Sequence, residues 1–341
     1  MNWTNNLWRI TMDTNPEDCN YHCIMCEEHS KYSHFKANLK SRCGISRREM
    51  PIEWLEPIIK QATEMGVKEI IPSTMGEPLL YKGIDDFFLL IKKYALKINL
   101  TTNGSFPGKS IDAWAKLIVP NTTDVKISIN GAKKETSEAI MQGSNFDKQM
   151  ENIKHLIAYR NQYFTKTGYY CRITLQLTFM QNNMQELSDI VKMAAGLDVD
   201  RIKGHHLWTH FKELNHLSMK ESAQSIHLWN QYVLQAIEAQ DKYRKPNGEK
   251  VVLENIVPID EEKNQEIPNS YDCPFLGKEL WISATGNISP CCAPDELRQS
   301  LGYFGNIQNE TMKDILNSDK YQDLVTNYKN MRICQTCNMR R

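Results

Sequence analysis

Three of the ten cysteines in this 341-residue chain crowd one short segment near its start. Cys19, Cys23 and Cys26 are separated by three and two residues. Three thiolates on one such segment can ligate three irons of a cubane iron–sulfur cluster, whose fourth iron then lacks a protein ligand. An open coordination position distinguishes a catalytic metal site from a closed structural one. The alternative is a zinc site, for which His22 or His29 could supply the fourth ligand.

A second group of cysteines lies near the other end of the sequence. Cys273 and Cys291 enclose seventeen residues, and Cys334 and Cys337 form a CxxC pair. Two separated ligands and one CxxC pair make a four-thiolate site that suits either zinc or a [4Fe–4S] cluster. The sequence therefore predicts two metal centres.

Three further cysteines, Cys43, Cys171 and Cys292, belong to neither group. Cys292 directly follows Cys291, and a vicinal pair rarely gives both thiolates to one cluster. We expect Cys292 to be a packed thiol, an alternate ligand or a hydrogen-atom donor. Buried free cysteines are common, and the same interpretation holds for Cys43 and Cys171.

Histidines also gather at one place, where His205, His206 and His210 occur within six residues at the end of an expected strand. Such side chains could act as a base or as hydrogen-bond donors. Arg172 and Gln176 could point inward together from the preceding strand.

The composition is that of an ordinary globular chain, with 41% hydrophobic and 24% charged residues. Forty-one basic residues balance 41 acidic ones, and this zero formal charge argues against general binding to nucleic-acid backbones. No segment approaches the ~18 consecutive apolar residues of a membrane span, and residues 1–8 do not resemble a secretory signal. We therefore expect a cytoplasmic protein. A reducing compartment favours metal binding or catalysis over disulfides for clustered cysteines.

Strand-like and helix-like segments alternate through the first two thirds of the chain. The helix-like segments carry apolar residues at three- and four-residue steps, as in Trp54, Ile58 and Ala62. Alternation implies parallel strands with right-handed crossovers, and six repeats favour a partial (β/α)6 barrel over a closed eightfold one. In such a barrel the active site lies at the carboxyl ends of the strands. The expected strands are 7–13, 69–72, 97–102, 124–130, 172–178 and 201–204, and the expected helices are 51–65, 84–94, 111–117, 146–163 and 184–195.

The alternation stops after residue 210. We expect a barrel core over 1–210, a helical insertion and linker over 211–265 with one long helix at 217–243, and a smaller domain over 266–341. That domain is predicted to contain a hairpin turning at Thr285 and Gly286 and a helix over 311–327.

The CxxxCxxC segment after the first strand of a (β/α)6 barrel resembles the signature of the radical S-adenosylmethionine (SAM) enzymes. Residues 73–78 (Ser-Thr-Met-Gly-Glu-Pro) resemble the GGEP motif, which binds the amino group of SAM, although Met75 replaces the first glycine. Residues 101–104 (TTNG) and 126–130 (KISIN) resemble further segments near SAM. Met25 stands where an aromatic residue usually lies by the adenine, and a thioether can also pack against a purine. The SAM contacts implied by the resemblance are Met25, Gly76, Glu77, Pro78, Asn103 and Ser128.

The second cysteine group resembles the twitch form of the SPASM extension, which holds one auxiliary [4Fe–4S] cluster. The implied ligands of this auxiliary cluster are Cys273, Cys291, Cys334 and Cys337. The implied ligands of the first cluster are Cys19, Cys23 and Cys26. Because the sequence ends at Arg341, a second auxiliary cluster is not expected. The resemblance thus implies an α/β fold with a partial (β/α)6 TIM-like barrel and a C-terminal twitch/SPASM domain, two [4Fe–4S] clusters and SAM.

The chemistry that the family implies is reductive cleavage of SAM and hydrogen-atom abstraction from a substrate carbon by the 5′-deoxyadenosyl radical. A flavodoxin- or ferredoxin-like electron donor is the implied partner, and neither a membrane nor a nucleic acid is expected. We predict dehydrogenation or epimerisation of a small polar substrate, sugar- or cyclitol-like. The alternative is a maturase or epimerase of a ribosomally made peptide, and a structural zinc protein is a further one. The candidate catalytic residues are Cys292, Cys171, Cys43, His205, His206 and His210.

Overall fold

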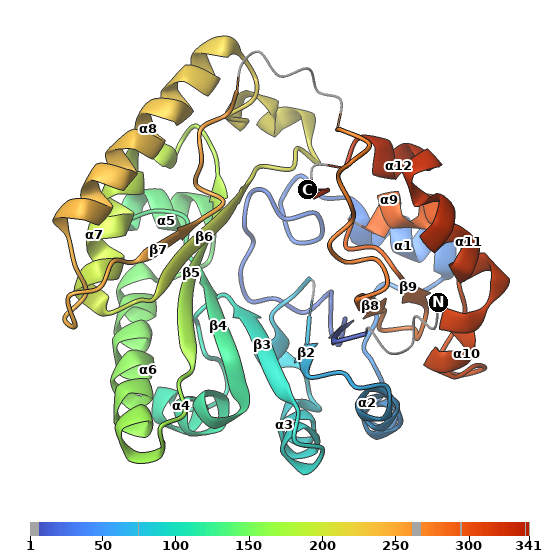
Figure 1. Ribbon diagram of the computed structural model, residues 1–341. Helices are drawn as coiled ribbons and strands as arrows, with labels where there is room; N and C mark the ends of the chain where they lie inside the picture. Colours follow the sequence, from blue (N-terminus) through green and yellow to red (C-terminus); the bar gives the residue numbers. More distant parts are fainter. Residues whose placement is uncertain (1–6, 74, 261–266, 294, 338, 341) are drawn as a thin grey trace.

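The computed structural model describes residues 7–73, 75–260, 267–293, 295–337 and 339–340 (Figure 1). It is an α/β structure built on one nine-stranded sheet with the strand order β7-β6-β5-β4-β3-β2-β1-β8-β9. Every neighbouring pair from β7 to β8 is parallel, and only β9 runs antiparallel to its neighbour β8. The strands are β1 Arg9–Met12, β2 Glu69–Ile71, β3 Lys97–Thr102, β4 Thr122–Ser128, β5 Arg172–Phe179, β6 Arg201–His206, β7 Val252–Glu254, β8 Glu279–Ile282 and β9 Ile288–Ser289.

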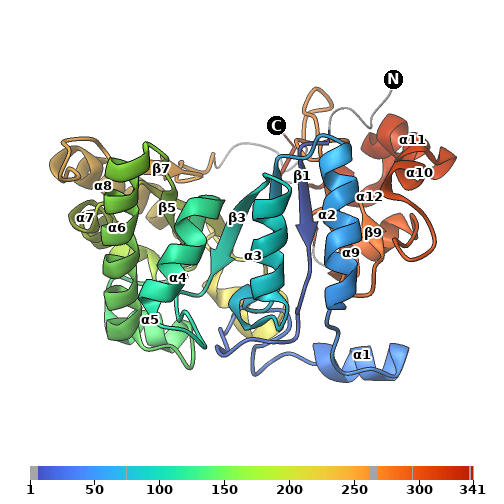
Figure 2. The same cartoon turned by 90° about the horizontal axis from the view of Figure 1, so that it is seen from below.

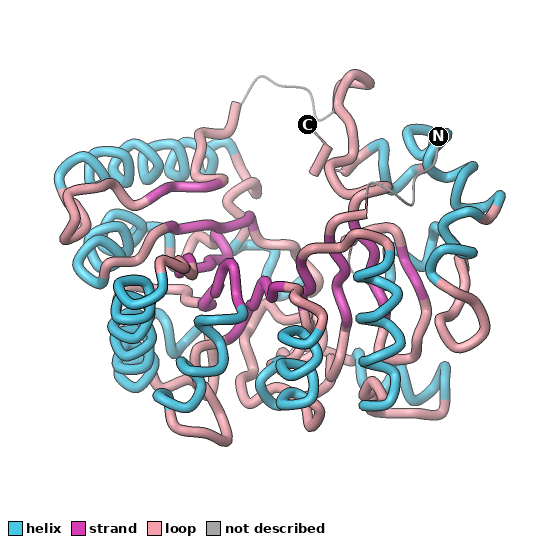
Figure 3. The backbone as a smooth tube through the Cα atoms, turned by 60° about the horizontal axis from the view of Figure 1, so that its bottom comes forward, coloured by secondary structure: helices cyan, strands magenta, loops and turns pink. Residues whose placement is uncertain are grey.

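The sheet curves into an arc with helices on its outer face, which confirms the partial barrel (Figures 1 and 3). The strands from β1 to β5 are largely buried, as expected of parallel strands covered on both faces. The helices are α1 Phe35–Cys43, α2 Leu55–Glu64, α3 Ile84–Lys93, α4 Ile111–Ile118, α5 Lys134–Ile140, α6 Phe146–Thr167, α7 Leu187–Leu197, α8 Ala223–Lys242, α9 Asp295–Arg298, α10 Met312–Asn317, α11 Asp319–Asn327 and α12 Arg332–Gln335.

All six strands expected from the sequence are present, and β3 has the predicted bounds. The fourth strand begins two residues earlier than expected, at Thr122, which pairs with Ile98. A seventh parallel strand, β7, was not expected and pairs with β6. Helices α1 and α5 were also not expected. In α1 only Phe35 and Leu39 are buried, too few for an apolar stripe.

Strand β8 lies directly beside β1, so the C-terminal part extends the sheet of the barrel rather than forming a separate one. Arg9 stands opposite Glu279 in this parallel pair and opposite Glu69 in the pair with β2. Its guanidinium contacts both carboxylates, at 2.6 Å for Glu69 and 2.9 Å for Glu279. Because all three side chains are mostly buried, the ion pairs join β2, β1 and β8 at the start of the strands.

The hairpin expected at Thr285 and Gly286 is present as β8 and β9, with Gly286 in the left-handed region at φ 84°. The single helix expected over 311–327 is broken. Ser318 adopts an extended conformation at ψ 146° and its side chain caps α11 by accepting a hydrogen bond from the backbone N–H of Tyr321.

Two expectations fall partly outside the described residues: the domain boundary near residue 265, and Thr74 of the segment that resembles GGEP. In the part of the chain that the structure describes, no helix combines the length and the apolar character required to cross a bilayer.

Candidate active site

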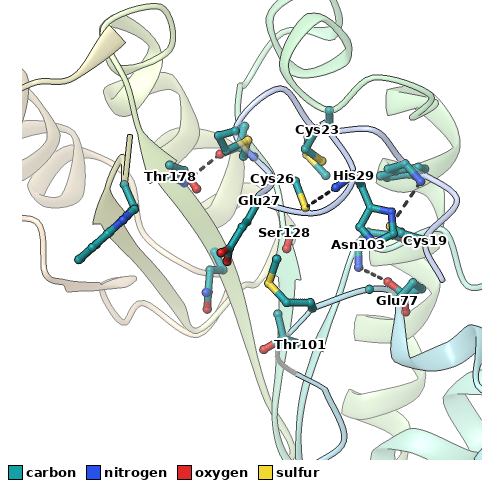
Figure 4. Close-up of a pocket in the computed structure, with 18 of the residues that line it drawn as sticks. Cys19, Cys23, Cys26, Glu27, His29, Glu77, Thr101, Asn103, Ser128 and Thr178 are labelled. Atoms are coloured by element: carbon teal, nitrogen blue, oxygen red, sulfur yellow. Dashed lines mark hydrogen bonds between the residues drawn. The ribbon is translucent and has the colours of Figure 1, made fainter. Parts of the chain in front are cut away.

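A cavity of about 540 Å³ opens at the carboxyl ends of the barrel strands, with the loop after β1 on its wall (Figure 4). Residues separated by more than 270 positions meet there, because the segment after β9 also contributes to the wall. Of the residues expected at the site, the wall includes Cys19, Cys23, Met25, Cys26, Gly76, Glu77, Asn103, Ser128, His205, His210 and Cys292.

Four other candidates lie elsewhere in the structure. Cys171 is fully buried just before β5, at the strand end opposite the cavity, and Cys43 is exposed at the end of α1. His206 packs its ring against Trp229, at a centroid distance of 4.8 Å, and burial lowers its pKa to about 4. Pro78 is buried at the start of a 3-10 turn behind the wall. The expectation that Cys171, Cys43 and His206 reach the reacting atoms is therefore not supported by their positions.

Hydrogen-bond donors surround the first three thiols. The backbone N–H of Tyr21 lies 3.4 Å from Cys19 Sγ, the backbone N–H of His29 lies 3.4 Å from Cys26 Sγ, and the Asn103 amide lies 3.8 Å from Cys19 Sγ. Such donors favour the anionic thiolate, which is the form that binds iron.

When no metal is bound, burial favours the neutral thiol over the thiolate at these three cysteines. It raises the pKa of Cys19 and Cys23, and raises that of Cys26 to about 12. A metal cluster would supply the positive charge that keeps such buried thiols ionised. Among the described residues, no three His, Cys, Asp or Glu side chains converge as ligands of one metal ion. Thiolates on a cubane bind three different irons and need not converge on one point, so these residues fit a cluster.

Glu77 lies in the wall of the same cavity and is held by donors from the end of β3 and from the 3-10 turn that directly follows Glu77. Its carboxylate accepts hydrogen bonds from the Asn103 N–H at 2.7 Å, the Thr102 hydroxyl at 2.8 Å and the Leu79 N–H at 3.2 Å. The side chain is 1% exposed, and this burial raises the pKa of Glu77 to about 7 despite the three donors. An ammonium group in the cavity would favour the ionised carboxylate.

Gly76 is in close contact with the cysteine loop. It has φ 74°, and a Cβ atom there would lie 2.4 Å from the Asn15 carbonyl oxygen and 2.8 Å from that of Asp18. The next residue, Glu77, donates its N–H to the same Asp18 oxygen at 2.7 Å. A glycine is therefore required for the loop after β2 to pack against the loop that carries the cysteines.

A buried arginine joins the two ends of the cysteine loop. Arg48 contacts Glu17 at 2.5 Å and Glu28 at 3.2 Å. Burial, followed by the nearby Glu17 charge, raises the pKa of Glu28 to about 9. Because Glu17 precedes Cys19 by two residues and Glu28 follows Cys26 by two, this contact fixes both ends of the segment. Nothing in the sequence spacing pointed to Arg48.

The second cysteine group also comes together. Burial raises the pKa of Cys334 to about 12, and the charges of Cys291, Cys273 and Cys337 act on it in the same direction. Backbone N–H groups of Leu276 and Ala293 lie 3.4 Å from the sulfurs of Cys273 and Cys291. The four thiols thus fit a second cluster by the same criteria as the first three.

Cys292 lies between the two groups. It forms part of the cavity wall, while the charges of Cys291, Cys337 and Cys273 follow burial in raising its pKa. One thiol therefore borders both the cavity and the second cysteine group.

Sequence reasoning found only part of the polar wall. Residues two apart on adjacent strands face the cavity: Ser128 at the end of β4 with Asn130 after it, and Gln176 with Thr178 on β5. The two-residue period of a strand was the signal that could have found them. Gln176 faces the cavity as expected, but Arg172 is exposed at the start of β5 and does not join it. Thr101 and Thr102 of the TTNG segment also lie on the wall, and the unexpected wall residues include Glu27, Met141, Trp208 and Arg298.

The close packing at Gly76 generates a prediction. Replacing Gly76 by alanine forces the cysteine loop away from the loop after β2, and we expect the iron content of the N-terminal site and the affinity for SAM to fall at least tenfold. Gly108→Ala is the matched control, since Gly108 has φ 76° and a Cβ atom added there would meet no other atom within 4 Å. Iron analysis and SAM titration measure both effects, and equal losses in the two variants would contradict the steric argument.

Comparisons with known proteins agree with this geometry. The family model of the radical SAM superfamily matches residues 16–174, and that of the SPASM iron–sulfur cluster-binding domain matches residues 273–338. A probable GTP 3′,8-cyclase of Thermococcus kodakarensis is 25% identical over 181 residues, which are 52% of this chain and 50% of the relative. A GTP 3′,8-cyclase of Aliarcobacter butzleri is 31% identical over 141 residues, 40% of this chain and 39% of the relative. The chain thus spans about half the length of the curated relatives it matches, or less.

Solved structures share the fold over nearly the whole chain. Streptococcus suis SuiB bound to S-adenosylmethionine has a TM-score of 0.67 at 16% identity and covers 98% of this chain and 71% of its own. Native anSMEcpe with bound AdoMet has a TM-score of 0.63 at 17% identity and covers 98% of this chain and 88% of its own. With the two family matches, the fold and the two cysteine groups lead to one conclusion. The chain belongs to the radical SAM superfamily and carries a SPASM iron–sulfur cluster-binding domain in its C-terminal part.

Proposed function

We propose that this radical SAM enzyme removes a hydrogen atom from a carbon of a small polar substrate held in the cavity, and thereby dehydrogenates or epimerises it. The observation that carries the proposal is the single cavity that joins Cys19, Cys23 and Cys26, Glu77 and a polar wall from β4 to β6. When bound, the cluster supplies the electron that splits SAM into methionine and the 5′-deoxyadenosyl radical.

The residues around Glu77 support a role in holding the amino group of SAM. A carboxylate offers about four acceptor positions, and protein donors occupy three of them here. Because Glu77 lines the cavity, the remaining position suits one N–H of an ammonium group bound there. The three protein donors fix the carboxylate, so that little side-chain entropy is lost on binding.

The size and polarity of the cavity support a small substrate. About 540 Å³ has to hold SAM as well as the reacting part of the substrate. Amide, hydroxyl and imidazole groups of Asn130, Gln176, Thr178 and His205 line the wall and match the hydroxyl groups of a polyol. His205 is exposed on this wall, and a neutral imidazole there is able to accept a proton.

A peptide substrate is the second candidate. It is favoured by Trp208, which borders the cavity and is 46% exposed, because an exposed aromatic ring at a site also suits a peptide side chain. Precursor peptide SuiA is bound in one structure of SuiB, whose fold this chain shares. GTP belongs in any substrate test because two relatives are named GTP 3′,8-cyclase or probable GTP 3′,8-cyclase.

The proposed function predicts two clusters and SAM cleavage. After anaerobic reconstitution we expect about eight irons and eight sulfides per chain, without zinc, and formation of 5′-deoxyadenosine with dithionite. Cys19→Ser should abolish 5′-deoxyadenosine while keeping the four irons of the second site. Cys334→Ser is the converse control and should lower only the second site. Zinc without iron would contradict the proposal, and stimulation by polyols, peptides or GTP identifies the substrate class.

A variant of Cys292 distinguishes epimerisation from dehydrogenation. If the enzyme epimerises, Cys292 is the only thiol outside the two cysteine groups that the described structure places on the cavity wall, so Cys292→Ala should stop product formation while 5′-deoxyadenosine still forms. If it dehydrogenates, product should persist in Cys292→Ala. Cys171→Ala, remote from the cavity, is the control and should form product in either case. Transfer of solvent deuterium into the product of wild type, absent in Cys292→Ala, would identify the thiol as the donor.

The raised pKa of Glu77 predicts a pH dependence of SAM binding. The carboxylate is neutral below about pH 7 and ionised above it, so its attraction for an ammonium group should be lost as the pH falls through 7. We expect the affinity for SAM to be several-fold higher at pH 8 than at pH 6. Glu77→Gln should bind SAM weakly and with a flat profile over this range. Titration by calorimetry at both pH values checks this, and a sloping profile in Glu77→Gln would assign the effect to another group.

A further inference from the structure

The inner face of the barrel sheet is polar along its strands. Helices α2, α3, α4 and α6 lie side by side along the outer face (Figure 2), and the strand residues that pack beneath them are apolar, such as Leu100, Ile127 and Leu175. The residues that alternate with these point to the inside of the barrel, where Thr101 and Ser128 line the cavity (Figure 4). A closed barrel fills its inside with bulky apolar side chains. A polar inner face indicates instead a space that holds a polar molecule.

Two arginines pair with the carboxylates near the amino ends of these strands. Arg9 contacts the carboxylates on β2 and β8, and Arg201 contacts both Asp124 on β4 and Glu254 on β7. The Lys203 ammonium shares Glu254 with Arg201, at 2.7 Å. Each of these four carboxylates therefore already has a cationic partner.

Lys126 lies on β4 between this ion-paired end and the cavity. It stands opposite Thr101 in the register of β3 and β4 and precedes Ser128 by two residues, and both of these neighbours belong to the cavity wall. Its ammonium donates to the side-chain oxygen of Asn99 at 2.5 Å. An ammonium has three N–H donors. Within the described parts of the chain, no carboxylate lies at ion-pair distance from this ammonium and no second acceptor is bonded to it, so two donors remain for a ligand.

The Lys126 ammonium is held in this position although its charge is poorly compensated. The Asn99 amide N–H donates to Glu69 at 3.1 Å, which turns the Asn99 oxygen toward Lys126. Burial lowers the pKa of Lys126 to about 8, because one neutral amide does not replace the water that a charged ammonium loses. The group still carries its charge at pH 7, and an anion beside it would restore the compensation.

Gln176 on β5 supplies a second unsatisfied group at the same place. It lines the cavity opposite Ser128 in the register of β4 and β5, and its side-chain oxygen is buried without a hydrogen-bond donor among the described residues. A buried acceptor without a donor costs free energy, which a ligand hydroxyl would recover. The level of Gln176 is two residues along the sheet from that of Lys126, or about 7 Å. This separation suits a molecule with a hydroxyl group a few bonds from an anionic group.

We propose that Lys126 binds an anionic group of the substrate, a phosphate or a carboxylate, while Gln176 accepts a hydrogen bond from one of its hydroxyl groups. This inference rests on the proposed function, because it places the anion on the molecule whose carbon loses a hydrogen atom. It narrows the substrate class from a small polar molecule to a sugar phosphate or a sugar acid. The anion lies toward the amino ends of the strands, so the carbons attached to it extend toward the cysteine loop.

The test follows the reactivity of Lys126 and requires no turnover. The reconstituted enzyme, kept anaerobic with saturating SAM and no reductant, is labelled with an uncharged succinimidyl acetate and analysed by peptide mass spectrometry. Only the neutral amine reacts, so an anion that raises the pKa of Lys126 by about one unit slows its labelling about tenfold. We expect inorganic phosphate or acetate to do so, compared with sodium chloride at equal ionic strength. Lys97 is the internal control, because its ammonium donates to the Pro120 carbonyl oxygen at 2.8 Å and its labelling should not change.

Variants then measure the contribution of each side chain to binding. By calorimetry, Lys126→Met should raise the Kd of the protecting anion at least about tenfold, since a charge-assisted contact is lost, and Lys126→Arg should retain most of the affinity. Lys97→Met is the matched control and should change the Kd less than twofold. Gln176→Leu should leave the Kd of the inorganic anion or acetate unchanged, and should weaken the binding of glycerol 3-phosphate or glycerate several-fold. If Lys126→Met does not fold, the labelling of wild type still decides the outcome.

The outcomes separate this inference from the proposed function. Protection by phosphate identifies a phosphate ester as the substrate class, and protection by acetate identifies a carboxylate. Labelling of Lys126 that neither anion slows would overturn the anion site. Protection by SAM alone, measured against the SAM-free enzyme and with no further effect of either anion, would assign the ammonium to the SAM carboxylate and overturn it as well. Failure of wild type to form 5′-deoxyadenosine with dithionite would instead refute the proposed function, and the labelling result does not depend on that reaction.

Discussion

The site depends on how a short loop with three buried thiols is kept in one conformation. Burial disfavours the thiolate forms of Cys23 and Cys26. Without a metal, the three cysteine side chains therefore contribute no ionic contacts that would hold the loop. The protein therefore holds the loop through its backbone. Gly76 and Glu77 pack against the carbonyl groups of residues 15–18, and Arg48 joins Glu17 to Glu28. Glu77 belongs to the same contact, so the group suited to bind SAM is positioned together with the loop suited to bind the cluster.

The C-terminal part reaches this site because it is joined to the barrel at β1. Strand β8 pairs with β1 over four residues, and the Arg9 ion pairs reinforce the junction. The polypeptide that follows β9 returns to the cavity, where Cys292 and Arg298 complete the wall. Both matched family regions therefore contribute to the cavity wall, although the cysteines of the first group lie entirely in one of them.

Features that depend on local pattern were predicted from the sequence, and features that depend on distant pairing were not. The six strands of the barrel repeat, the two cysteine groups and the positions of Glu77 and Asn103 follow from periodicity, spacing and a family resemblance. His206 was placed wrongly because neighbouring residues on a strand face opposite sides, so that only one of His205 and His206 could reach the cavity. The pairing of β8 with β1 joins residues about 270 positions apart, and no local signal specifies it. Helix α1 lacks an apolar stripe and was missed for that reason.

The parallel register of β1 and β8 has a consequence for the relation between the two cysteine groups. The first group begins seven residues after β1, and Cys291 follows the hairpin that begins with β8. A shift of this pairing by one residue would move one group past the other by about 3.3 Å and turn its strand over. The spacing between the two redox centres is thus set by main-chain hydrogen bonds rather than by the side chains around the substrate. Substitutions can consequently reshape the cavity while the distance between the two cysteine groups stays the same.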